Sequence, residues 1–230
     1  MGVVSSVVSS RGGAVGGDIV GTLLKTFRRG WVVFSALTFV LLGFALTSCA
    51  GTKGRVAVGT YYAPLKNFSM PIPFAGPRIQ DGYGENGGYV SFSNTWGGLK
   101  SVLYERLPPE VAKMASDPGQ RDQVFREYLH KQAMPNIFRK ASAQATLLRE
   151  EILTADGAYF ALVRIPEASN VFDVRENRFL DSVRSLLIFG KADFLYMLTE
   201  EADSSIESQP SVIDSLIKTR DSMAFDRGGT

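Results

Sequence analysis

Alternating apolar and polar positions between residues 56 and 107 predict a series of short antiparallel strands. Val90 and Phe92 alternate with Tyr89, Ser91 and Ser93, and this period of two buries one face of a strand. Glycine, proline and polar residues between the runs provide the turns. The predicted strands of this part cover residues 59–62, 68–72, 88–93 and 99–104.

Pro108 and Pro109 end the strand section, and a helical period of three and four is expected after Asp117. Asp117, Pro118 and Gln120 resemble a helix start with an N-cap, a first-turn proline and a capping-box partner. Pro135 is expected to end or kink the helix. The apolar stripe that should face the core consists of Val124, Phe125, Tyr128, Leu129, Ala133 and Ile137.

Two nearly continuous apolar runs in the second half of the chain predict central strands. Residues 185–189 and 194–198 form a hairpin that folds about Gly190 and Lys191. Such runs are typical of strands that are covered on both faces. Further strands are expected over residues 145–153 and 159–165, joined by a tight turn.

A second helix near the end of the chain completes the pattern, opening at Ser208 and Pro210. The order strands, helix, strands, helix predicts an α+β fold with a mostly antiparallel sheet backed by two helices. We expect one domain over residues 56–225 and a tail at 226–230. This order and size resemble the PsbP-like fold, a sheet sandwiched by helices that recurs in small bacterial lipoproteins and hosts several non-enzymatic roles. Core-facing positions of the second helix are Val212, Ile213, Leu216, Ile217 and Met223.

The chain's single cysteine ends an apolar run of 18 residues, 31–48, that follows Lys25, Arg28 and Arg29. A basic segment, an apolar segment and small residues before a break are typical of a secretory signal. The order Leu46-Thr47-Ser48-Cys49 resembles the lipobox of bacterial lipoproteins. The resemblance implies cleavage between Ser48 and Cys49 and a diacylglycerol, hence palmitate, on the Cys49 sulfur.

In this interpretation residues 1–48 are a signal peptide that forms a helix, and residues 49–55 are a tether. A retained single-pass anchor and a buried core helix are the alternatives, since 18 residues are near the lower limit for spanning a bilayer. Basic residues before the run keep the N-terminus cytoplasmic, which places the domain in the periplasm. Ala50 after the cysteine implies the outer membrane, if the cell is Gram-negative.

Residues 1–22 lengthen the basic segment well beyond what a signal needs and show no helical or strand period. Our hypothesis is that translation starts downstream, near Val20, Leu23 or Leu24. A tryptic peptide ending at Arg11 would contradict it.

The formal net charge of +2 belongs largely to the segment before Cys49, which holds four of the 25 basic and one of the 23 acidic residues. The remaining 21 basic and 22 acidic residues nearly balance. No block of basic residues follows Cys49, so we expect no nucleic-acid or anionic-lipid footprint. With its one cysteine assigned to the lipid, the chain has no thiol for a disulfide, a metal or a nucleophile. We expect no cofactor other than this covalent lipid.

Three features of the sequence are candidates for chemistry. The glycine run 82–88 matches G-x-G-x-x-G, but a β-prone run follows it where a dinucleotide site needs a helix, so we expect a flexible inter-strand loop. His130 is the only histidine and is expected on the surface without metal or triad partners. The neighbouring carboxylates at 150–151 and 200–201 should point to opposite faces of a strand. We therefore name no catalytic and no metal-binding residue.

Loop aromatics are the remaining candidates for recognition. Trp96 lies in a predicted hairpin loop and Tyr83 in the glycine run, where exposed rings would serve as partner contacts. The leading hypothesis is a lipid-anchored, non-enzymatic envelope domain that binds a protein or a cell-envelope component. The alternatives are an envelope hydrolase that uses carboxylates and a single-pass membrane protein with an assembly role.

Overall fold

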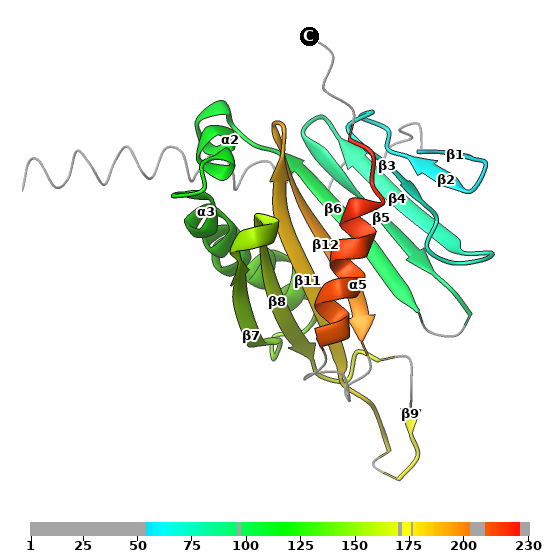
Figure 1. Ribbon diagram of the computed structural model, residues 1–230. Helices are drawn as coiled ribbons and strands as arrows, with labels where there is room; N and C mark the ends of the chain where they lie inside the picture. Colours follow the sequence, from blue (N-terminus) through cyan, green and yellow to red (C-terminus); the bar gives the residue numbers. More distant parts are fainter. Residues whose placement is uncertain (1–53, 96–97, 170–171, 176, 203–209, 226–230) are drawn as a thin grey trace, which may run out of the picture. The chain divides into compact units, whose positions relative to one another are not determined.

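The structure, a computed structural model, describes residues 54–95, 98–169, 172–175, 177–202 and 210–225 (Figure 1). The chain divides into two compact units, residues 1–47 and 48–230, and every described residue belongs to the second. The predicted signal segment, most of the tether and the tail lie outside the described residues. Within the described ranges, no helix combines the length and the apolar composition that crossing a membrane requires.

Seven antiparallel strands form the main sheet. They are β4 (Arg78–Gly84), β5 (Gly87–Ser93), β6 (Leu99–Arg106), β7 (Thr146–Leu153), β8 (Ala158–Ile165), β11 (Ser182–Lys191) and β12 (Phe194–Ala202). Their order across the sheet is β4-β5-β6-β12-β11-β8-β7. Leu186, Leu187 and Ile188 of β11 are all completely buried, so both faces of the sheet are covered, as the apolar runs predict. Burying each of these side chains stabilises the fold by about 1.5–3 kcal/mol.

A small antiparallel sheet covers the β4–β6 part of one face. It consists of β1 (Arg55–Ala57), β2 (Thr60–Tyr62) and β3 (Ser69–Pro71). Tyr61 and Met70 are buried in one cluster with Phe92 of β5, and the Tyr61 and Phe92 rings meet edge to face with centroids 5.7 Å apart. A two-stranded ribbon, β9 (Phe172–Asp173) with β10 (Arg178–Phe179), precedes β11. The sequence predicted β2 and β3 but not β1, β9 or β10.

Consecutive helices cover the other face of the main sheet, over β8, β11 and β12. They are α2 (Pro109–Ser116), α3 (Arg121–Tyr128), η1 (Leu129–Phe138) and α4 (Arg139–Ala141). The predicted apolar stripe is confirmed, since Phe125, Leu129 and Ala133 are completely buried against the sheet. η1 is a π-helix of ten residues with Pro135 inside it. π-Helices are rare, and a proline, which has no N–H to donate, is one cause of an irregular helical hydrogen-bond pattern.

The predicted cap of this helical segment is wrong. Asp117 is the residue that ends α2, and its carboxylate accepts a hydrogen bond from the Gly119 N–H at 3.0 Å. Gln120 precedes α3 but makes no side-chain capping bond. Residues 117–120 therefore form a turn between α2 and α3, and α3 begins at Arg121 without the predicted side-chain cap. The proline at the first position of a helix is Pro109 of α2, where its missing N–H costs nothing.

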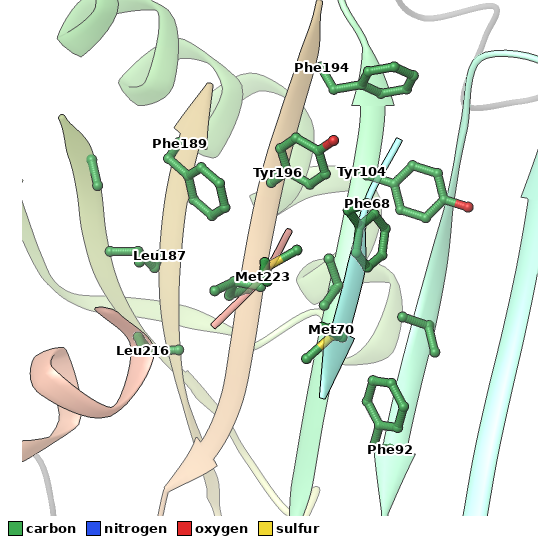
Figure 2. Close-up of a cluster of buried hydrophobic side chains, with 14 of the residues drawn as sticks. Phe68, Met70, Phe92, Tyr104, Leu187, Phe189, Phe194, Tyr196, Leu216 and Met223 are labelled. Carbon is green, nitrogen blue, oxygen red and sulfur yellow. The ribbon is translucent and has the colours of Figure 1, made fainter. Parts of the chain in front are cut away.

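The last helix, α5 (Pro210–Asp221), packs on the face that carries the small sheet. Leu216 of α5 and Met223 after it are buried with Leu187 of β11, as Figure 2 shows. Polar contacts hold the helix in place: Ser215 donates to Glu200 of β12 at 2.8 Å, and the same carboxylate pairs with Lys100 of β6 at 3.3 Å. The fold is thus α+β, with the main antiparallel sheet between the helices α2 to α4 on one face and α5 with the small sheet on the other.

Candidate functional site

The glycine run forms a tight β-hairpin. Gly82 and Gly84 belong to β4, residues 85–86 turn the chain, and Gly87 and Gly88 begin β5. The predicted flexible loop is therefore wrong, although the strand expected after it is confirmed. A Cβ on Gly88 would lie 2.5 Å from the Gly82 carbonyl oxygen and from the Tyr104 hydroxyl. The glycines thus serve close packing within the sheet and present no helix N-terminus to a phosphate.

Tyr83 begins a transverse row of residues across the sheet. It pairs with Gly88 of β5, which pairs with Tyr104 of β6, and Tyr104 pairs with Tyr196 of β12. The Tyr104 side chain reaches over Gly88 toward β4, and burial raises the pKa of its hydroxyl. Tyr83 itself is half-buried at the end of this row. The Tyr104 hydroxyl is buried without a hydrogen-bond partner among the described residues.

The opposite face of β4–β6 presents a different aromatic side chain. Tyr89 is 43% exposed and leans against Gly82, whose missing side chain leaves room for the ring. Beside it, the Ser91 and Ser101 hydroxyls share a hydrogen bond at 2.9 Å. Sequence reasoning chose Tyr83 and missed Tyr89, although the alternation over residues 89–93 already placed Tyr89 on the polar face. We call the surface formed by Tyr89, Ser91 and Ser101 the Tyr89 surface; an exposed tyrosine among small polar residues is common in protein-binding surfaces.

The other predicted site residues, Ser48, Cys49 and Trp96, lie outside the described residues. The loop that contains Trp96 is closed at its base, where the Asn94 N–H donates to the Gly98 carbonyl at 3.1 Å. The Gly98 N–H in turn donates to the Asn94 side chain at 2.8 Å. This loop joins β5 to β6, the strands that carry the Tyr89 surface.

Asp81 of β4 ties the first described residue to this part of the sheet. Its Oδ2 accepts hydrogen bonds from the Gly54 N–H at 2.6 Å and from the Tyr61 hydroxyl at 3.0 Å. Burial raises the pKa of the Tyr61 hydroxyl, and the negative charge of Asp81 is the second-largest cause of this increase. The chain therefore enters the fold at the outermost strand of the sheet, beside the glycine hairpin.

A buried carboxyl group lies where β6 runs under the helices. Glu105 is only 4% exposed, and its Oε2 has no hydrogen-bond partner among the described residues. Burial raises the pKa of Glu105 to about 7. Tyr128 of α3 is close enough for the charge of Glu105 to add to the effect of burial in raising the pKa of that hydroxyl. This carboxyl is closed off from solvent, so it has no access to a substrate.

His130 lies on the surface, as predicted, and has a partner that the sequence did not reveal. Its Nε2 is 2.8 Å from Glu150 Oε2, which also accepts a hydrogen bond from the Tyr159 hydroxyl at 2.7 Å. Arg126 Nε donates to that hydroxyl at 3.2 Å. The bond from Tyr159, and then that from His130, lower the pKa of Glu150. The group links the outer strand β7 to the helices, and an ionised carboxylate cannot serve as a general acid.

Adjacent carboxylates do point to opposite faces. Glu200 pairs with Lys100 beneath α5, whereas Glu201 accepts a hydrogen bond from Ser182 at 2.8 Å. A cavity of about 350 Å³ is lined by two acids, Glu167 and Asp181, together with Gln144, Thr146, Arg164 and Pro166. Asp181 is engaged there, since it accepts hydrogen bonds from Arg164 Nε at 2.6 Å and from the Glu167 N–H at 3.2 Å. Among the described residues no group of histidine, cysteine and carboxylate side chains could hold a metal.

Comparison with known proteins adds distant likenesses of fold. No known family matches the sequence, and no curated protein matches it. The structure is similar to a crystal structure from Bacteroides thetaiotaomicron, with a TM-score of 0.40 and 13% identity over 78% of this chain. The chain spans only about half of that protein, 51%. It is also similar to the cyanobacterial PsbP protein, CyanoP, from Synechocystis, with a TM-score of 0.43 and 17% identity over 79% of this chain and 99% of CyanoP.

Proposed function

We propose that the chain is a lipid-anchored, non-enzymatic domain of the cell envelope, facing the periplasm, that binds a protein or another envelope component. The observation that carries the proposal is the order Leu46-Thr47-Ser48-Cys49 at the end of an apolar run, directly before the folded domain. The single cysteine has no thiol partner in the sequence and is at the position that the resemblance assigns to the lipid.

The tether supports a location close to the bilayer. The described fold starts at Gly54, which is bonded to Asp81, so only four residues of the sequence, 50–53, separate it from Cys49. The five Cα–Cα steps from Cys49 to Gly54 span at most about 18 Å when the chain is fully extended. Diacylglycerol and an amide-linked acyl chain, at about 0.8 kcal/mol per buried methylene, would make the attachment effectively permanent. A domain held this close to a membrane meets partners in or on that membrane.

The chemistry of the described residues favours binding over catalysis. The carboxyl group whose pKa is raised, Glu105, is buried away from solvent, whereas Asp181, one of the two acids of the 350 Å³ cavity, is held by Arg164 and a backbone N–H. A carboxylate hydrolase needs one protonated and one ionised group together at an open site. The Tyr89 surface, by contrast, is exposed and lacks such groups.

Replacing Cys49 with alanine should abolish palmitate incorporation and leave a precursor that is not cleaved at residue 48, because the thiol is the acceptor of the lipid. Ser48→Ala is the matched control, since it keeps a small residue before the cleavage point and should be processed normally. Radiolabelled palmitate and the intact mass report the two outcomes. Unchanged labelling of the Cys49→Ala protein would overturn the anchor. A wild-type product that retains residues 1–48 would favour the single-pass alternative.

A photo-crosslinking residue at position 89 should capture a discrete partner in living cells, because Tyr89 is the exposed ring of the β4–β6 face. Position 96, a site chosen from sequence, should give the same adduct if its loop borders that surface, whereas position 83, which lies on the opposite face of β4, tests a separate contact. Lys113 on the exposed side of α2 is the control position and should give none. Identical adducts from 89 and 113, or no specific adduct from any of the three, would contradict a binding role for this face.

A further inference from the structure

The β1–β2 hairpin exposes apolar side chains at the point where the chain enters the fold. Val58 at its tip is fully exposed and Val56 is 50% exposed, and both follow the tether by only a few residues. Arg55 lies over the ring of the partly exposed Tyr62, with its guanidinium carbon 4.8 Å from the ring centroid. Figure 1 shows this hairpin at the β4 and β5 side of the main sheet.

The hairpin tip also carries a residue that its turn does not favour. Val58 and Gly59 form a two-residue turn with φ values of 49° and 72°, and such turns favour asparagine followed by glycine. Among the described non-glycine residues with positive φ, only Val58 is β-branched. A β-branched residue at positive φ is a genuine outlier. Since Val58 makes no buried contact that could offset this strain, the apolar tip points to a contact outside the chain.

Charge in this part of the chain is one-sided. Residues 50–80 contain four basic side chains and no acidic one, and Asp81 is the first acid after the cysteine. The basic residues are dispersed, so no basic run marks the segment in the sequence. Apolar side chains, an aromatic ring and cations together are the features that settle at the interface of an anionic bilayer. The four basic residues are Lys53, Arg55, Lys66 and Arg78.

We propose that the β1–β2 hairpin inserts its tip into the interface of the anionic bilayer to which the chain is attached. The inference rests on the lipid anchor at Cys49, because the chain between them keeps Gly54, the residue before the hairpin, within about 18 Å of Cys49. Val56 and Val58 enter the acyl boundary, Tyr62 lies at headgroup level, and Arg55 pairs with lipid phosphate. The hairpin thereby fixes the orientation of the domain on the membrane and leaves the Tyr89 surface free for a partner.

An environment-sensitive fluorophore at position 58 tests the insertion. In lipidated Val58→Cys protein the new thiol is the only free one, so it can be labelled with the fluorophore NBD after purification of the full chain. In vesicles of phosphatidylcholine and phosphatidylglycerol we expect blue-shifted emission and a dithionite reaction several-fold slower than at the exposed control position, Gly119→Cys. Omitting phosphatidylglycerol, or adding Arg55→Gln, should reduce the shift.

Three outcomes separate this proposal from the anchor itself. Emission and dithionite rates equal to those at position 119, in protein that floats with the vesicles, overturn the insertion and keep the anchor. Shielding of position 58 that is just as strong in Cys49→Ala protein in buffer, with neither vesicles nor detergent, overturns it in favour of a protein contact. If wild-type protein does not float with the vesicles and its Cys49 reacts with a maleimide, the lipid anchor is absent and the proposed function itself is contradicted.

Val58→Asn gives a second readout that does not depend on labelling. Asparagine before glycine suits the turn, so the urea midpoint of unfolding should rise. In vesicles the same variant should lose protection of the amide groups around the tip from hydrogen exchange, whereas wild type gains it. A wild-type hairpin that gains no protection on vesicles would contradict the insertion.

Discussion

Glu105→Gln should stabilise the protein by about 3 kcal/mol at pH 8 relative to its effect at pH 4. The carboxyl is 4% exposed, one of its oxygens has no partner among the described residues, and burial raises its pKa from 4.5 to about 7. At pH 8 the folded protein must hold a buried negative charge, and the amide removes that cost. Urea unfolding at pH 4, 6 and 8 measures the effect.

The direction of this pH dependence follows from the number of protons that each state binds. Between pH 4.5 and about 7 the folded state holds the proton that the unfolded state has already released, so stability falls as pH rises. The stability that protonated Glu105 contributes is therefore fully present below its pKa in the unfolded state, and it is lost as pH rises through its pKa in the folded state. Any constant cost of burying the amide is the same at every pH and cancels in the comparison.

Glu127→Gln on the exposed side of α3 is the matched control. The pKa of Glu127 is lowered, first by the hydrogen bond from Gln123 and then by Lys131, so its contribution has the opposite sign and is lost as pH falls. Its side chain is partly exposed, so the effect should be small. Wild-type and Glu105→Gln proteins whose stabilities change in parallel from pH 4 to pH 8 would refute the buried charge.

Much of the sheet could be predicted because its strands carry an unambiguous period. The alternation around Val90 and Phe92 and the continuous apolar runs of β11 and β12 each have one physical explanation, and each is confirmed. β4 was missed because Arg78–Gly84 has an apolar residue only at Ile79 and Tyr83 and contains two glycines. β4 forms because its backbone approaches β5 closely, and this long-range pairing is not visible in the local sequence of residues 78–84.

The candidate site was harder to predict because its parts meet only through the fold. The hydrogen-bonded group of His130, Glu150 and Tyr159 joins a helix to two strands, and nothing in the spacing indicates it. The orphaned oxygen of Glu105 likewise depends on helices that cover β6. Tyr89 was accessible to sequence reasoning, since its place on the polar face follows from the same alternation that buried Val90.

Gly88→Ala should destabilise the protein by about 3 kcal/mol, at the upper end of what over-packing usually costs. The added Cβ would lie 2.5 Å from the Gly82 carbonyl oxygen, a backbone atom in a paired strand that cannot move without breaking the ladder. It would also lie 2.5 Å from the Tyr104 hydroxyl, a side chain locked among buried rings. Urea unfolding of the variant measures the loss.

Tyr104→Phe separates the two clashes. Its hydroxyl is buried without a partner among the described residues, so removing it alone should cost little. In the double variant, Gly88→Ala with Tyr104→Phe, the clash with the hydroxyl is gone and the clash with the Gly82 carbonyl remains. Part but not all of the lost free energy of unfolding should therefore be recovered. Gly119→Ala, whose nearest neighbour would be 3.5 Å away, is the control and should be nearly neutral. Equal costs at positions 88 and 119 would mean that Tyr104 does not occupy the space above Gly88, and the aromatic row that ends at Tyr83 would then be incorrect.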